Sequence, residues 1–271
     1  MTGAVISGAV VNGAVISGEA IGWRVGGAQI LDDVSLHVGA GELLGIIGPN
    51  GAGKSSLVNI LSGVTRPTTG TVRLGGDDVT RRSATRRARL GLSRSFQTSA
   101  LFDGLTAGEN VLLAVQASGA APFSPFRVAR PRSRPRIGEA DGEADTGRDV
   151  DVLLERVRMP GRAATAARDL SHGDRRKLEL AMALASNPKV LLLDEPMAGV
   201  SAEDVDGLTE IIGEVRDSGV AVAMVEHHMH VVLGLADRVA VLHHGQLLAT
   251  GSPDEVTEDE RVQEAYLGEA L

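Results

Sequence analysis

Hydrophobic and polar residues along most of the chain follow the periods of strands and helices. Segments 30–38 and 70–76 alternate like half-buried strands, whereas the apolar runs 43–48, 189–195 and 220–227 are typical of strands buried on both faces. Helical spacing occurs in segments 55–64, 106–116, 149–158, 174–186 and 203–217. Because strands alternate with helices, we predict an α/β fold with a mainly parallel sheet and helices on both faces. A hairpin at 238–251 adds an antiparallel β portion.

Two segments break this pattern. Residues 1–17 carry no charged side chain and repeat in fives (GAVIS, GAVVN, GAVIS), a period that fits neither strand nor helix, and they lack the basic start of a secretory signal. We therefore expect an N-terminal extension outside the fold. Residues 117–148 combine four prolines with arginines and then a Gly-Glu-Asp run, which predicts an insert with too little apolar surface to fold alone.

Composition narrows the function classes. The formal net charge of −8 argues against nucleic-acid binding over the whole surface, and the lack of cysteine excludes disulfides and thiolate metal sites. The basic run 81–94 has two interpretations, a solvated helix face or a contact with a partner or anionic lipid. No segment reaches the roughly 18 consecutive apolar residues of a membrane-spanning helix.

The segment "GPNGAGKSS" matches the phosphate-binding loop G-x-x-x-x-G-K-[ST] and lies between a buried strand and an amphipathic helix. Its glycines let backbone N–H groups converge on phosphate oxygens at the positive end of the helix. Lys54 should reach the β- and γ-phosphates, and Ser55 should bind Mg²⁺. The predicted nucleotide-binding residues of this loop are Gly48, Pro49, Asn50, Gly51, Ala52, Gly53, Lys54, Ser55 and Ser56.

An acid pair ends the buried strand in "VLLLDEP". Asp194 could hold Mg²⁺ through its water shell, and Glu195 could polarise the attacking water as general base. A pair of acids at a strand end is also typical of a solvated turn. Because the same chain contains a phosphate-binding loop, the functional interpretation of the acid pair is favoured. The two motifs together indicate a nucleotide hydrolase but do not show which kind.

The order of five motifs along the chain indicates which kind of nucleotide hydrolase this is. The phosphate-binding loop, Gln97 in "RSFQ", "LSHGD" at 170–174, the Asp194–Glu195 pair and His227 in "MVEHH" resemble the ATP-binding subunits of ABC transporters, whose signature motif is LSGGQ. The resemblance covers about residues 20–271. Within that family, "SRSFQTSALFDGLTAGENVLLA" and the tail "VQEAYLGEAL" are similar to the ATPases of branched-chain amino acid and urea importers.

The resemblance implies a function for each motif. Two ATPase domains meet head to tail around two ATP molecules, so Ser171 and the N–H of Gly173 would bind the γ-phosphate held by the opposing chain. Gln97 would contact Mg²⁺ or the attacking water, and His227 would hydrogen-bond the γ-phosphate. Val25 occupies the place where this subgroup carries an aromatic residue that stacks on adenine, and Trp23 lies nearby.

Two more departures from the family pattern raise alternatives. Asp174 replaces the usual Gln of the signature, and its carboxylate either caps the following helix beside Ser171 or weakens the closed state by repelling the triphosphate. His228 stands where relatives usually carry Asp. The cluster "HHMH" suggests a metal site, but adjacent side chains at a strand end point apart, so none is expected.

We therefore expect a P-loop core at 18–97 and 188–250, a helical subdomain at 98–187 and an acidic helical tail at 251–271. The resemblance implies a MgATP-driven ATPase dimer on the cytoplasmic face of the membrane, working with permease subunits and a substrate-binding protein. Branched-chain amino acids are the expected substrate, with urea or short amides as the alternative. An ABC-type ATPase acting on ribosomes or DNA, and a P-loop kinase, are further alternatives; neither fits a single P-loop combined with the signature stretch.

Overall fold

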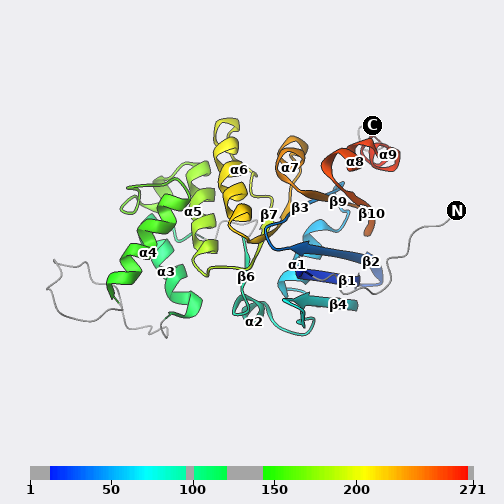
Figure 1. The fold of residues 1–271 in the computed structure, drawn as a ribbon, viewed down its shortest axis with the longest axis horizontal. Helices are drawn as coiled ribbons and strands as arrows, with labels where there is room; N and C mark the ends of the chain where they lie inside the picture. Colours follow the sequence, from blue (N-terminus) through cyan, green and yellow to red (C-terminus); the bar gives the residue numbers. More distant parts are fainter. Residues whose placement is uncertain (1–12, 96–100, 121–142, 268–271) are drawn as a thin grey trace.

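A six-stranded sheet in the order β10-β9-β3-β8-β7-β6 forms the centre of the molecule (Figure 1). The computed structural model describes residues 13–95, 101–120 and 143–267. Strands β9, β3, β8, β7 and β6 pair in parallel, and only β10 runs antiparallel to β9. The strands are β3 (Leu43–Ile47), β6 (Leu92–Arg94), β7 (Val190–Asp194), β8 (Ala221–Val225), β9 (Arg238–His243) and β10 (Gln246–Gly251). The predicted α/β fold with a mainly parallel sheet is confirmed.

The apolar runs form the middle strands because both faces of this sheet are covered. Every residue of β3, β7 and β8 is buried. Within β7, Val190 and Leu192 pack into one hydrophobic cluster, whereas Leu191 and Leu193 pack into the other. A strand that is buried on both faces carries apolar residues at successive positions, instead of alternating apolar with polar residues.

The first face is covered by α1 (Lys54–Ser62) and a second, antiparallel sheet in the order β2-β1-β4-β5. The expectation that helices cover both faces holds only in part for this face, because the antiparallel sheet covers it together with α1. Its strands are β1 (Ala14–Val25), β2 (Ala28–Gly39), β4 (Thr69–Leu74) and β5 (Asp77–Asp78). The expected boundary of the core at residue 18 is therefore wrong, because β1 begins at Ala14 and Ile16 is buried. Register shifts along β1 interrupt the two-residue period, which hid the strand in the sequence. Residues 1–12 lie outside the described residues.

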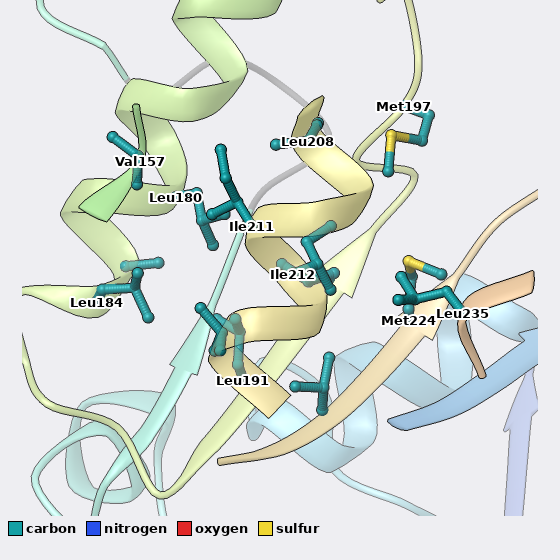
Figure 2. Close-up of a cluster of buried hydrophobic side chains, with 14 of the residues drawn as sticks. Val157, Leu180, Leu184, Leu191, Met197, Leu208, Ile211, Ile212, Met224 and Leu235 are labelled. Carbon is teal, nitrogen blue, oxygen red and sulfur yellow. The ribbon is translucent and has the colours of Figure 1, made fainter. Parts of the chain in front are cut away.

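Helices cover the second face and extend beyond the sheet (Figure 1). They are α3 (Ala107–Val115), α4 (Glu143–Arg156), α5 (His172–Leu184), α6 (Ala202–Asp217), α7 (Met229–Leu235), α8 (Pro253–Glu258) and α9 (Glu260–Leu267). Figure 2 shows Leu208, Ile211 and Ile212 of α6 packed between Leu180 of α5 and Met224 of β8. In the described segments no helix is both long and apolar enough to cross a membrane.

The ends of the predicted unfolded insert are helical. Residues 116–120 form one π-helical turn that continues α3, and α4 begins at Glu143 rather than after residue 148. The later part of α4 buries Val150 and Leu154 among the other helices, and this packing stabilises a helix longer than the apolar periodicity indicates. Residues 121–142 lie outside the described residues.

One arginine of the basic run is part of the core. Arg87, in α2 (Ala84–Ala88), is completely buried, and its guanidinium donates to the carbonyls of Ile60 and Leu61, both at 2.7 Å. These carbonyls belong to the last turn of α1, where backbone acceptors need partners. Burial lowers the pKa of Arg87 to about 10, so the group stays charged at neutral pH.

We predict that Arg87→Met lowers the free energy of unfolding by about 2–4 kcal/mol, because it leaves buried carbonyls of α1 without a donor. Urea denaturation measures this change. The matched control is Arg86→Met, one residue away and exposed, which should change stability by less than about 0.5 kcal/mol. Equal losses in the two variants would contradict the role assigned to Arg87.

Candidate functional site

Three neighbouring parallel strands end at the same level of the sheet. Val225 of β8 pairs with Ile46 of β3 on one side and with Asp194 of β7 on the other. The segments that follow these strands therefore emerge together, and in open α/β sheets ligands bind at this carboxyl edge. The predicted phosphate-binding loop, acid pair and histidine all lie in these segments.

The phosphate-binding loop needs glycine at two close approaches. Gly48 has a φ of +147°, and a Cβ there would lie 2.1 Å from the carbonyl oxygen of Leu242. Gly53 has a φ of +100°, and a Cβ there would lie 2.7 Å from Leu31. Any larger residue would push the loop away from β2 and β9.

The loop ends at a helix N-terminus with a cation beside it. Gly53 is the N-cap residue of α1, and no side chain in the described part of the chain caps this end, which leaves the first-turn N–H groups available to an anion. Lys54 is buried, and its Nζ donates to the carbonyls of Gly48 and Pro49, the latter at 2.8 Å. The ammonium group is thus held against the loop, in a position where it could neutralise the negative charge of a bound phosphate.

Asp194 is paired with an arginine that the sequence did not reveal. Arg94 Nη2 lies 2.9 Å from Asp194 Oδ2, and Nη1 donates to Asn59 Oδ1 at 2.6 Å and Ser62 Oγ at 3.0 Å. Arg94 thereby joins the ends of β6 and β7 to α1. In the sequence it was one of several arginines in the run 81–94, and its partners lie far away along the chain.

The other oxygen of Asp194 is suited to a metal-bound water. Oδ1 is buried and has no hydrogen-bond partner among the described residues. A buried carboxylate oxygen without a donor is unfavourable unless a ligand supplies one. This orphaned oxygen fits the prediction that Asp194 holds Mg²⁺ through water, with Ser55 in the first turn of α1 as the other described candidate.

The structure brings two of the three predicted catalytic side chains, Glu195 and His227, into contact. His227 Nε2 lies 2.9 Å from Glu195 Oε1, although 32 positions separate the residues in the chain. Glu195 has a φ of +52°, a left-handed conformation that is unusual for a residue with a side chain, and its N–H donates to the carbonyl of Val225 at 2.9 Å. Such backbone conformations cluster at functional sites.

The signature stretch lies elsewhere, at the start of α5, which is separated from α1 by β7 and α6 (Figure 1). Ser171 caps this helix by accepting from the N–H of Asp174 at 3.1 Å. The Asp174 carboxylate lies 3.5 Å from Lys177 Nζ and 4.0 Å from Arg162 Nη2, so two cations face its charge. Gly173 packs against α6, where a Cβ would lie 2.5 Å from Asp204 Oδ2.

The remaining predicted residues lie outside this group. Val25 ends β1 with half of its surface exposed. Trp23, which the sequence placed near the adenine position, instead packs against the hydrophobic core. Gln97 lies outside the described residues. Among the described residues no group of His, Asp and Glu forms a metal cluster, and His227 and His228 face different carboxylates.

The fold and the geometry of this site are those of a P-loop nucleotide-binding protein. Comparisons with known proteins identify the family within that class. A profile of the family described as "ABC transporter" matches residues 31–198, and a second, described as "Branched-chain amino acid ATP-binding cassette transporter", matches residues 246–271. The first match covers more than half of the chain. The chain belongs to the ABC transporter family, as an ATP-binding cassette ATPase.

Individual relatives match over nearly their full length. The chain is 36% identical over 248 residues to the high-affinity branched-chain amino acid transport ATP-binding protein LivG of Salmonella typhimurium, which covers 91% of this chain and 95% of the relative. Identity to BraF of Pseudomonas aeruginosa is 35% with the same coverage. The solved ADP conformation of MJ1267, an ATP-binding cassette of an ABC transporter, superposes with a TM-score of 0.81 at 29% identity, covering 94% and 99% of the two chains.

We predict that Arg94→Met lowers the free energy of unfolding by about 3–5 kcal/mol, because it strands the buried charge of Asp194. Adding Asp194→Asn to this variant should recover part of the loss, since the stranded charge is then removed. Urea denaturation of both variants tests this, with the exposed Arg89→Met as control. No recovery in the double variant would mean that Arg94 acts through Asn59 and Ser62 rather than through Asp194.

Proposed function

We propose that this chain is the ATPase subunit of an importer for branched-chain amino acids. The contact between Glu195 and His227 beside the phosphate-binding loop carries the catalytic part of the proposal. The substrate part is supported by the names of LivG and BraF as branched-chain amino acid transport ATP-binding proteins and by the tail match at residues 246–271. Selection of the transported molecule would belong to the substrate-binding protein and the permease subunits.

In this proposal residues 48–56 bind the phosphates of ATP. Backbone N–H groups of the loop and of the first turn of α1 donate to phosphate oxygens, and Lys54 turns from the loop carbonyls to the β- and γ-phosphates. Ser55, Asp194 and Gln97 would hold Mg²⁺, which when bound neutralises charge on the phosphates. The exposed side chain of Val25 would contact the adenine through an aliphatic surface instead of a stacked ring.

Hydrolysis uses the two residues in contact at the sheet edge. Glu195 accepts a proton from water while the water oxygen attacks the γ-phosphorus and the bond to the bridging oxygen of ADP breaks. His227 Nε2 is close enough to orient the carboxylate, and it would hydrogen-bond the γ-phosphate once nucleotide is bound. Because the left-handed backbone conformation of Glu195 sets the orientation of its side chain, the carboxylate is already positioned before nucleotide binds.

Completion of the site requires a second chain. Ser171 and Gly173 lie on α5, apart from the phosphate-binding loop of their own chain (Figure 1). In a head-to-tail dimer they would contact the γ-phosphate held by the partner. The negative charge of Asp174 is faced by Lys177 and Arg162, which reduces its repulsion of the triphosphate. We therefore propose that Asp174 is compatible with dimer closure.

Closure and reopening of the dimer would drive the membrane subunits. The ATPase would sit on the cytoplasmic face, attached through permease subunits and acting only indirectly with a substrate-binding protein. ATP binding would favour the closed state, and hydrolysis would return the open state, so that the bistable element is the dimer interface.

We predict that Glu195→Gln lowers kcat by about 10²–10⁴, the usual contribution of a general base, and traps an ATP-bound dimer. Size-exclusion chromatography with and without MgATP, together with phosphate release, measures both effects. The control is Glu155→Gln on the exposed side of α4, which should hydrolyse ATP at the wild-type rate and elute as the wild type does. A monomer in both conditions would count against the homodimer.

We also predict that Asp174→Gln, added to Glu195→Gln, changes the ATP concentration needed for dimerisation by less than about tenfold, or ~1.4 kcal/mol. The reason is that Lys177 and Arg162 already offset the carboxylate. If Glu195→Gln stays monomeric and the double variant dimerises, the carboxylate opposes closure and this prediction is wrong.

A further inference from the structure

Glu226 is a buried acid that the proposed hydrolysis does not use. Its side chain is 1% exposed and follows β8 directly, on the inner side of the site. An ionised carboxylate in such a place requires hydrogen-bond donors for both oxygens. The identity of these donors indicates what the residue does.

The donors come from both sides of the Glu195–His227 contact. Oε1 accepts from the N–H of Met197, two residues after Glu195, at 2.7 Å. Oε2 accepts from the N–H groups of His227 at 3.0 Å and His228 at 3.4 Å. One carboxylate therefore connects the turn that carries the general base to the segment that carries its histidine partner.

The fourth donor is the ring of His228. Its Nδ1 lies 2.9 Å from Glu226 Oε2, and because a carboxylate only accepts, this nitrogen carries the hydrogen. The His228 side chain is 48% exposed, and it does not cap α7, at whose N-terminus it lies. Its ring contacts are with the Glu226 carboxylate and, edge to face, with the ring of His230 at 6.0 Å.

These contacts matter because the catalytic geometry is strained. Glu195 has a φ of +52°, which persists only where surrounding bonds determine it. The Met197 N–H bond to Glu226 fixes the turn just after Glu195, and the His227 N–H bond to the same carboxylate fixes the backbone that directs the imidazole. Rotation of the Glu226 carboxylate would release both segments together.

We propose that Glu226 and His228 form a positioning pair that holds His227 against Glu195: the Nδ1–H of His228 fixes the Glu226 carboxylate, which fixes the backbone on both sides of the catalytic contact. Neither residue touches nucleotide in this arrangement. The inference rests on the proposed ATPase function and adds residues that control its rate.

Two substitutions at residue 228 test the pair. Asn places an amide N–H donor where His carries Nδ1, whereas Leu places a methyl group there. His228→Leu should lower kcat for ATP hydrolysis more than tenfold with KM for ATP within threefold of the wild type, and His228→Asn should restore kcat to within threefold. His230→Leu, an exposed histidine of α7 whose ring lies 6.0 Å from that of His228, is the control and should stay at the wild-type rate.

A measurement that does not depend on hydrolysis separates positioning from misfolding. In the Glu195→Gln background, His228→Leu should still form the ATP-dependent dimer, because nucleotide binding does not use the pair. Glu226→Gln should behave like His228→Leu, since one amide oxygen cannot accept both from Met197 and from the histidine segment.

The outcomes distinguish this inference from the function it rests on. A wild-type rate in His228→Leu, or equal losses in the Asn and Leu variants, would overturn the positioning pair while leaving the ATPase intact. A raised KM or a lost dimer in His228→Leu would likewise overturn it in favour of a structural role. A wild-type protein that does not hydrolyse ATP would instead overturn the proposed function.

Discussion

The pairing of β3, β8 and β7 is the constraint on which the site depends. Parallel hydrogen bonding sets Ile46, Val225 and Asp194 side by side, so the three segments that follow these strands leave the sheet at one level. No hydrogen bond within any one segment could produce this arrangement. The two hydrophobic clusters on either face of the sheet hold the strands in this register, and a slip by one residue would exchange the faces on which their side chains pack.

Buried charged side chains join the segments around this carboxyl edge of the sheet. Asp194 pairs with Arg94, Glu226 accepts from Met197 and the two histidines, and Arg87 donates to the carbonyls that end α1. Charges in a protein interior are tolerated only where bonded partners replace water. Each of these groups therefore ties together segments that hydrophobic packing alone would leave free to shift. Around the proposed ATP site, neighbouring segments are therefore joined by buried charges as well as by hydrophobic packing.

The signature stretch at the start of α5 lies away from the carboxyl edge of the sheet where the other motifs meet. Ser171 and Gly173 are held firmly on α5, by a helix cap and by close packing against Asp204, but they are held away from the phosphate-binding loop of their own chain. In the proposed dimer this separation makes catalysis conditional on the partner. Lys177 and Arg162 face the Asp174 carboxylate, and in the proposed dimer they would reduce its repulsion of the partner's triphosphate.

The sequence by itself determined the features that depend on local order. The apolar runs predicted the buried strands, the glycine spacing predicted the phosphate-binding loop, and the acids at 194–195 were identified from their place at a strand end. His227 was identified through the resemblance to the ATP-binding subunits of ABC transporters. Only the tertiary structure decided the rest. The strand at 14–17 is stabilised by pairing on both sides with β2 and β4, and the bulges that this pairing requires erase its periodicity. The buried partners of Arg94, Arg87 and Glu226 were not predicted, because a charged residue in a sequence looks the same whether solvent or a buried group satisfies it. His228 was noted as a departure from the family pattern, but its hydrogen bond to Glu226 was not predicted. Burial and partners are properties of the folded chain, and they determine which charges act.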